Sequence, residues 1–183
     1  EDLRVEPAGD VESLRRDHVH IDGMTLPANQ DVVLDDVQGN AMEIVAEIDP
    51  KSAPMVALDV LRSPNKEEVT RIMFFKDRGF RNRQLQTQKS VITIDSSCSS
   101  ILPDVVTRAP ETGSFLLEEG EKLQLRVFID KSVVEVYANG KQCVALRVYP
   151  GREDSVGVSL RSQGQDTELI SLDAWQMENI YRS

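Results

Sequence analysis

The sequence has little that could hold a fold together without a hydrophobic core. Its two cysteines, Cys98 and Cys143, are too few for a disulfide framework in a chain of 183 residues. We expect two free, partly buried thiols, and a single Cys98–Cys143 bridge is the alternative. Only 5% of the residues are aromatic, so the chain offers no obvious row of rings on which a flat ligand would stack.

Long apolar runs and an excess of basic residues are also absent. No run approaches the about 20 apolar residues that span a bilayer, and the first residues lack the basic and apolar regions of a signal peptide. With 31 Asp and Glu against 21 Lys and Arg, the formal net charge is -10, which repels nucleic acid and anionic membrane surfaces. We therefore expect neither a nucleic-acid partner nor a membrane partner.

What the sequence does have is a series of short runs in which apolar and polar residues alternate. A period of two is typical of strands that bury one face, and turn-forming pairs such as Gly39-Asn40 and Asp49-Pro50 separate the runs. Helix is expected for a turn or two at most. The predicted strands are residues 16–21, 42–48, 55–61, 69–75, 90–94, 122–129, 133–138, 143–149, 155–161 and 167–177. They predict one antiparallel all-β sandwich of two sheets, each of roughly five to six strands.

Three polar stretches interrupt this pattern. Residues 1–13, with Pro7 and Gly9, are interpreted as a linker that enters the domain, and residues 14–183 as the domain itself. Residues 78–89 are rich in Arg and Gln and predict an exposed loop. Residues 96–113 predict a long connection.

The stretch from residue 123 to residue 150 is the most informative. After an alternating strand, Asp130-Lys131-Ser132 predicts a turn, and Asn139-Gly140 then suits a two-residue type I′ hairpin turn, because both residues tolerate positive φ. A third alternating run ends near Tyr149-Pro150. The stretch therefore predicts a three-stranded meander.

The residue order in this meander resembles the C-terminal β-sandwich domain of glycoside hydrolase family 32, which includes invertases, levanases, inulinases and other β-fructofuranosidases. The motif is Asp130-x-Ser132-x-x-Glu135-x-Tyr137-x-Asn139-Gly140, followed by Arg147-x-Tyr149-Pro150. Residues 12–15, 95–100 and 171–177, the last containing Trp175, are similar to further segments of that domain. Tyr137 stands where the family more often has Phe. The resemblance implies a lectin-like, concanavalin-like jelly roll behind a five-bladed catalytic propeller.

The resemblance also implies catalytic motifs that this sequence lacks. In the family, Asn-Asp-Pro, Arg-Asp-Pro and Glu-Cys carry the catalytic groups on the propeller, and none of the three occurs here. We interpret Asp130 and Ser132 as residues that satisfy turn amides, and Glu135 as a partner of Arg126 or Arg147 on neighbouring strands. A stand-alone hydrolase that uses Asp59, Asp130 or Glu135 is a less favoured hypothesis.

Two other features have a functional and a structural interpretation. His18, His20 and Asp22 alternate along one strand, a spacing that a metal ion can use, but a polar strand face is the favoured interpretation. Trp175 is either a sugar-stacking platform or a core residue, and we favour the core. The other candidate aromatic residues for a sugar site are Phe80, Tyr137, Tyr149 and Tyr181. No metal or cofactor is expected.

The sequence thus predicts a non-catalytic sandwich domain that supports the catalytic propeller of the same parent enzyme, with no catalytic residue of its own. The resemblance implies that the parent hydrolyses terminal β-fructofuranosides such as sucrose, inulin or levan. An independent lectin-like module that binds carbohydrate, namely a fructan, is the alternative. Homo-oligomerisation through the domain is a further expectation.

Overall fold

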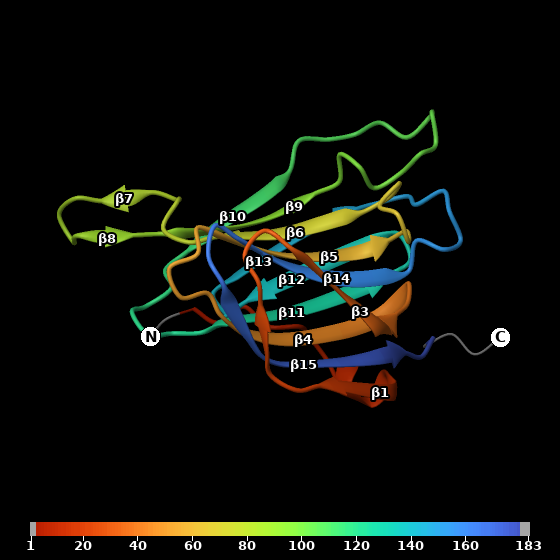
Figure 1. Ribbon diagram of the computed structural model, residues 1–183, viewed down its shortest axis with the longest axis horizontal. Coiled ribbons are helices and arrows are strands. Elements are labelled where there is room, and N and C mark those ends of the chain that lie inside the picture. Colours follow the sequence, from red (N-terminus) through yellow and green to blue (C-terminus); the bar gives the residue numbers. More distant parts are fainter. Residues whose placement is uncertain (1–2, 180–183) are drawn as a thin grey trace.

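A computed structural model describes residues 3–179, which form two antiparallel sheets packed face to face (Figure 1). Sheet A has 7 strands and sheet B has 6, and a separate 2-stranded hairpin projects from one end of the sandwich. The single helical element described is the short 3-10 helix η1 (Val11–Leu14). No helix in the described part of the chain is long and apolar enough to cross a membrane. The prediction of an antiparallel sandwich is confirmed.

The strand order places the first and last strands of the domain side by side. Along sheet A the order is β1 (Arg15–Ile21), β15 (Thr167–Met177), β4 (Ala41–Asp49), β11 (Leu123–Asp130), β12 (Val133–Ala138) and β13 (Gln142–Arg147), and β2 (Met24–Leu26) also pairs with β15. Along sheet B the order is β10 (Glu111–Phe115), β9 (Ser90–Asp95), β6 (Thr70–Phe75), β5 (Met55–Arg62), β14 (Gly157–Gln163) and β3 (Asp31–Gln38). The projecting hairpin consists of β7 (Arg81–Asn82) and β8 (Thr87–Gln88).

The core lies between the sheets and is built by the alternation seen in the sequence. In β11 and β12 every second side chain points inward and is buried. The central strand β5 is buried on both faces, which is why its sequence is almost continuously apolar. Each fully buried Leu, Ile, Val or Phe stabilises the fold by about 1.5–3 kcal/mol. The largest side chains with less than 2% exposure include Phe74, Ile44, Leu58, Ile72, Ile92, Leu123 and Ile129.

All ten predicted strands are present, with ends that shift by one or two residues. The sequence missed β3 and β10, which form the two edges of sheet B. Edge strands bury few side chains: β3 buries only Leu34 and Val37, so the apolar alternation is weak there. Residues 78–89 are not an irregular loop, because β7 and β8 form a hairpin within them. The sequence also missed the short strand β2.

The meander is confirmed, but its second turn differs from the prediction. Asp130 lies opposite Val133, so Lys131 and Ser132 form the first turn. In the second turn Asn139 and Gly140 have φ of 51° and 62°, as a type I′ turn requires. However, Ala138 lies opposite Gln142, so the loop has three residues, 139–141, instead of two. The additional residue, Lys141, extends its ammonium group to Glu121 at 2.7 Å.

We expect Asn139→Ala to destabilise the protein by roughly 2–3 kcal/mol. The side-chain Nδ2 of Asn139 donates to Lys122 O at 2.8 Å and to Glu121 Oε1 at 3.0 Å. Its side-chain Oδ1 accepts from the backbone N–H of Gln124 at 3.0 Å. Alanine loses these bonds and must still adopt positive φ. Urea unfolding followed by far-UV circular dichroism measures the change. Asn139→Gly is the control, because it keeps the backbone freedom and isolates the lost bonds; an alanine variant as stable as wild type would contradict this role.

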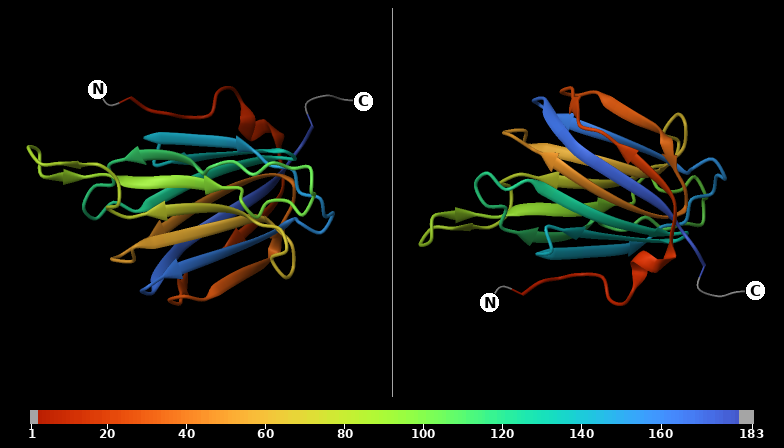
Figure 2. Two further views of the ribbon diagram at one scale, coloured as in Figure 1. Left: turned by 90° about the horizontal axis from the view of Figure 1, so that it is seen from above. Right: turned by 90° about the horizontal axis from the view of Figure 1, so that it is seen from below.

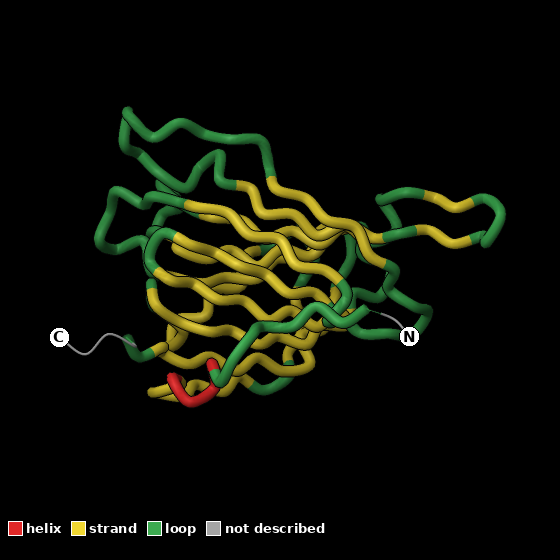
Figure 3. The backbone as a smooth tube through the Cα atoms, turned by 180° about the vertical axis from the view of Figure 1, so that it is seen from behind, coloured by secondary structure: helices red, strands yellow, loops and turns green. Residues whose placement is uncertain are grey.

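The segment before β1 lies against the outside of sheet A (Figures 2 and 3). The Val5 amide donates to Gly140 O at 2.9 Å, and Val5, Pro7 and Val11 are half-buried. None of the side chains described in residues 3–13 is fully buried, so this segment covers the sheet without entering the core.

Candidate functional site

The outer face of sheet A carries most of the polar residues that the sequence singled out. Because side chains alternate along each strand, the residues between the core positions of β15, β4, β11 and β12 point away from sheet B. They include Asp173 and Trp175, Glu43, Arg126 and Phe128, and Glu135 and Tyr137. The edge strand β1 adds Arg15, His18 and His20 to this face.

A buried carboxylate lies at the centre of this face. Glu43 has no exposed surface, and Arg15 donates to both of its oxygens at 2.8 Å through Nε and Nη2. Arg126 donates to Glu43 Oε1 through Nε at 2.6 Å. The hydrogen bonds with Glu43 raise the pKa of Arg15. Glu12, in η1, lies 3.6 Å from Arg15 and 3.5 Å from Arg126, so the entering segment adds a fourth charge to the network.

This network corrects the predicted role of Glu135. Glu135 lies directly opposite Phe128, whereas Arg126 lies opposite Tyr137 on one side and Val45 on the other. From that position Arg126 reaches Glu43 and not Glu135. Arg147 lies opposite Val133, and among the described residues it forms no ion pair with Glu135 either. The closest polar partner recorded for the Glu135 carboxylate is the Tyr137 hydroxyl at 3.5 Å.

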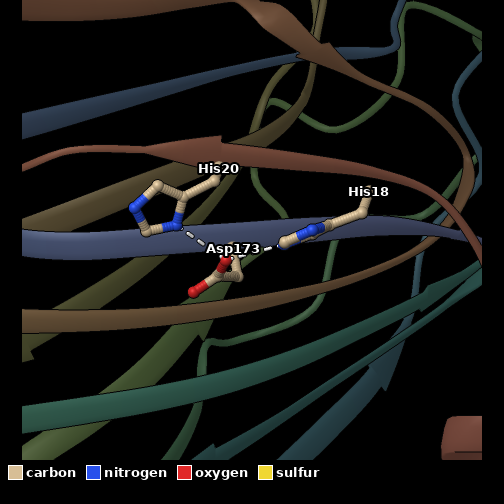
Figure 4. Close-up of side chains that lie close together, drawn as sticks. All are labelled: His18, His20 and Asp173. Carbon is tan, nitrogen blue, oxygen red and sulfur yellow. Dashed lines mark hydrogen bonds and ion pairs between the residues drawn. The ribbon is translucent and has the colours of Figure 1, made fainter.

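Beside this network, the two histidines meet one carboxylate (Figure 4). His18 Nε2 lies 2.7 Å and His20 Nδ1 lies 2.8 Å from the same atom, Asp173 Oδ1. The hydrogen bond with Asp173 raises the pKa of His20, and burial opposes this only in part. Although burial acts in the opposite direction, the hydrogen bonds from His20 and His18 lower the pKa of Asp173.

The polar strand face was the favoured interpretation of His18, His20 and Asp22, and in the less favoured metal-binding interpretation the third group differs from the one that the structure brings closest. The third close group is Asp173, from β15, and Asp22 lies farther away, 3.5 Å from His20 Nε2. Local alternation identified the two histidines. The missing signal was the pairing of β1 with β15, which places Asp173 directly opposite His20.

Trp175 is not a core residue, contrary to the prediction. Ala174 and Leu172 point inward from β15, so Trp175 points outward and is half-buried. Its ring stacks on His18 with centroids 4.8 Å apart and planes 7° apart, and the Arg15 guanidinium carbon lies 4.0 Å from the ring centroid. These contacts already occupy the ring, which makes it a poor open platform for a sugar.

The signature residues of the first turn line a shallow hollow of about 270 Å³ that Pro7, Ala8 and Val11 help to cover. Asp130, Glu135 and Tyr137 contribute to its lining. In the described residues the side-chain oxygens of Asp130 and Ser132 have no recorded hydrogen bond, so their predicted role in capping turn amides is not observed. The turn instead uses main-chain bonds, from Lys131 N to Asn40 O at 2.6 Å and from Val148 N to Ser132 O at 3.0 Å.

Both cysteines are free thiols, and the alternative of a disulfide bridge is not observed. Cys143 is half-buried beside Tyr137 on the outer face of sheet A, whereas Cys98 is exposed and not partly buried as expected. Burial raises the pKa of Cys143. Burial, together with Cys143 and Glu135, raises the pKa of Tyr137 to about 12, so the phenol is neutral at physiological pH.

The last three signature residues, Arg147, Tyr149 and Pro150, lie at the end of β13 and just after it. Arg147 and Tyr149 line a hollow of about 500 Å³ together with residues 104–109, and Tyr149 is 47% exposed. Pro150 follows them and is half-buried. Phe80 is exposed on the projecting hairpin, and Tyr181 lies outside the described residues. The candidate aromatic residues that the structure describes therefore do not form one surface.

Asp59 lies on the opposite side of the molecule from Asp130 and Glu135. It belongs to β5 of sheet B, is 1% exposed, and pairs with Arg71 at 2.8 Å and Lys66 at 2.9 Å. The carboxylates that the sequence offered for hydrolysis are thus divided between the two sheets.

A second buried glutamate, which the sequence did not single out, joins three segments. Glu68, just before β6, has no exposed surface. Its carboxylate accepts four hydrogen bonds: from Ile101 N at 2.8 Å, Gly151 N at 2.7 Å, Arg152 N at 3.1 Å and Ser155 Oγ at 2.6 Å. This one side chain therefore connects β6 with the loops that precede β10 and β14.

Comparisons with known proteins agree on one family. The family model described as "Glycosyl hydrolases family 32 C terminal" matches residues 10–176. The chain is 34% identical over 129 residues to the acid beta-fructofuranosidase of Vicia faba, an alignment that covers 68% of this chain and 19% of that protein. It is 26% identical over 206 residues to the vacuolar acid beta-fructofuranosidase 2 of a Rosa hybrid cultivar, an alignment that covers 96% of this chain and 31% of that protein.

Solved structures show the same fold at lower sequence identity. Fructan 1-exohydrolase IIa from Cichorium intybus matches with a TM-score of 0.82 and 19% identity, over 96% of this chain and 38% of that one. Exo-inulinase from Aspergillus awamori matches with a TM-score of 0.73 and 18% identity, over 96% of this chain and 32% of that one. The chain therefore spans between 19% and 38% of the length of these four relatives.

Proposed function

Because this chain belongs to the family of C-terminal domains of family 32 glycosyl hydrolases, we propose that it is a non-catalytic sandwich domain that supports a catalytic β-propeller. The observation that carries the proposal is the family match over residues 10–176, within a chain that spans only 19% of a relative such as the Vicia faba enzyme. The parent enzyme would hydrolyse terminal β-fructofuranosides such as sucrose, inulin or levan.

The domain boundaries follow from the same proposal. Residues 1–13 are the linker from the propeller, and residues 14–183 are the sandwich. None of the side chains described in residues 3–13 is fully buried, which supports this division, while the contact of Val5 and Pro7 with the outside of sheet A gives the linker a fixed path along the domain. The propeller of the same polypeptide is the main partner.

The distribution of carboxylates supports the absence of catalysis in this chain. A retaining glycosidase needs two carboxyl groups about 5–5.5 Å apart across the scissile bond. Asp59 is on sheet B and held by two cations, so it cannot form such a pair with Asp130 or Glu135 on sheet A. Asp130 and Glu135 line one hollow, and the variants below test that pair. The family's three catalytic motifs are also missing from the sequence.

Reconstitution tests this function. We expect the chain alone to release no fructose from sucrose or inulin, and a separately produced propeller of the parent enzyme to be more active and more thermostable when the chain is added. Heat-denatured chain is the control for a non-specific protein effect. Asp130→Asn and Glu135→Gln should leave the reconstituted activity within about twofold, because neither carboxylate acts in the reaction. Fructose release by the chain alone, or a propeller that is indifferent to it, would contradict the proposal.

Fructan binding and homo-oligomerisation remain predictions. Titration of inulin followed by calorimetric heat, with Trp175 fluorescence as a second readout, tests the first, and light scattering of the purified chain tests the second.

A further inference from the structure

The two histidines and Asp173 present three metal-ligand atoms toward one point on the surface (Figure 4). The three atoms, one from each residue, all lie within 4.8 Å of one another. His18 and His20 come from the same face of β1, and Asp173 comes from the neighbouring strand β15. The backbone ladder places His20 directly opposite Asp173, and His18 lies in the register irregularity between Arg16 and Val19, next to the paired residue Val19. The pairing of two strands that are distant in the chain therefore brings the ligand atoms together.

We propose that His18, His20 and Asp173 bind a divalent transition-metal ion of the zinc class. Zinc binds imidazole nitrogen and carboxylate oxygen at about 2.0–2.2 Å, and a tetrahedral site separates its ligands by about 3.4 Å. The two nitrogens lie 2.7 and 2.8 Å from Asp173 Oδ1, which is closer than ligands of one zinc ion. Side-chain rotations that move the ligand atoms apart by about 1 Å would admit the ion. The three protein ligands leave a fourth position for water.

The neighbouring groups favour this ion. Asp22 lies 3.5 Å from His20 Nε2, the nitrogen that faces away from Asp173. A carboxylate in that place accepts the other ring N–H of a bound histidine and orients the ring. The cation Arg15 also lies on this face, but its guanidinium is held by both oxygens of Glu43. The formal charge of -10 attracts a cation to the protein as a whole.

The position of the site gives it a structural consequence. β1 is the first strand of the sandwich and an edge strand of sheet A, whereas β15 is the last strand described. An ion bound by His18, His20 and Asp173 would connect the two. Because the folded state alone brings these residues together, binding would raise the melting temperature with increasing zinc concentration.

Nuclear magnetic resonance of the wild-type 183-residue chain gives the most direct test, because His18 and His20 are its only histidines. We expect zinc sulfate to shift the ring nitrogen signals of both residues, with the largest changes at His18 Nε2 and His20 Nδ1. Calorimetry should give one site per chain. Magnesium and calcium should have no effect at the same concentration, because they prefer sites built from oxygen ligands.

Substitutions then identify the ligands. Loss of a residue that hydrogen-bonds to a metal ligand typically weakens metal binding by about 10- to 100-fold. His20→Gln and Asp173→Asn remove a ligand itself, so each should weaken zinc binding by more than this. Asp22→Asn should fall within that smaller range. Asp17→Asn, an exposed carboxylate on the same strand, is the matched control and should bind as wild type does. Cys98→Ser excludes binding by the exposed thiol.

Three results would overturn the proposal. They are the absence of any histidine shift with millimolar zinc, unchanged affinity in both His20→Gln and Asp173→Asn, and loss of binding in Cys98→Ser. The wild-type spectra decide the question even if a ligand variant fails to fold.

Discussion

Replacing Glu43 with alanine is expected to destabilise the protein by about 3–5 kcal/mol, the range for removal of one partner from a buried ion pair. Glu43 is fully buried, and its carboxylate is the acceptor for Arg15 and Arg126. Without it, two guanidinium groups remain beside each other in a partly desolvated place, since their side chains are only 21% and 27% exposed. The loss therefore exceeds what one missing surface ion pair would cause.

Further variants separate charge from shape. Glu43→Gln keeps the volume and removes the charge, so we expect a smaller loss of about 1.5–3 kcal/mol, the range for a hydrogen bond to a charged group. The triple variant Glu43→Leu, Arg15→Met and Arg126→Met should recover most of the stability lost in Glu43→Ala, because an apolar replacement leaves no buried charge unpaired.

Urea unfolding followed by far-UV circular dichroism is the measurement for these variants. Trp175 fluorescence is a poor probe of them, because Arg15 lies against its ring. Glu47→Ala is the matched control: Glu47 lies on the same face of β4, is half-buried and has no ion pair recorded within residues 3–179. We expect it to change the free energy of unfolding by less than about 0.5 kcal/mol. Equal losses of unfolding free energy in Glu43→Ala and Glu47→Ala would show that the ion network does not stabilise the protein.

The sequence could predict the strands that carry this network but not the side chains that pair in it. Alternation in β4 and β11 is local, so both strands were predicted nearly to their ends. Which outward residues meet depends on register between strands that are distant in the chain. Arg126 was assigned to Glu135, on the next strand in sequence, but it pairs with Glu43, 83 residues away. A charged residue inside an apolar run, as in Met42-Glu43-Ile44, was the one local signal of a buried partner.

The dependence on strand register also explains where the structure differs from the other predictions. His18 and His20 were found from their spacing, but Asp173 required the pairing of the first and last strands. Trp175 was assigned to the core because large aromatic residues usually lie there. The side of a strand that faces inward is set by its whole pattern, and Leu172 and Ala174 already fill the inward positions. Asn139 and Gly140 were predicted correctly because positive φ is a local property of the residue type.

Glu68→Gln is expected to destabilise the protein by about 3 kcal/mol at neutral pH. All four groups that meet the Glu68 carboxylate are donors, three of them backbone amides. A glutamine side chain replaces one acceptor oxygen with an NH2 group, which then faces another donor. The loss should be close to that of Glu68→Ala. Glu153→Gln, in the exposed part of the loop that Glu68 anchors, is the control and should lie within about 0.5 kcal/mol of wild type.

The contribution of Glu68 should also depend on pH with a definite sign. Although burial acts in the opposite direction, the hydrogen bonds from Ser155 and from the three backbone amides lower the pKa of Glu68. The unfolded-state pKa of a glutamate is about 4.3, so the stabilisation is complete above that pH and is lost as the pH falls toward the lower folded-state pKa. The difference in unfolding free energy between wild type and Glu68→Gln should therefore be constant from pH 7 to about pH 5 and shrink below about pH 4.3.

Comparing the two proteins at each pH isolates this residue. Other carboxylates with lowered pKa values, such as Asp31 and Asp49, lose their own contribution in acid, but they do so equally in wild type and variant. Because Glu68 joins β6 to two loops, its protonation should release those loops before the sheets unfold. Hydrogen exchange at the amides of Ile101, Gly151 and Arg152, followed as the pH is lowered below about 4.3, tests this order. Amides that stay protected at a pH where the stability difference between wild type and Glu68→Gln has vanished would mean that the loops are held by contacts other than this carboxylate.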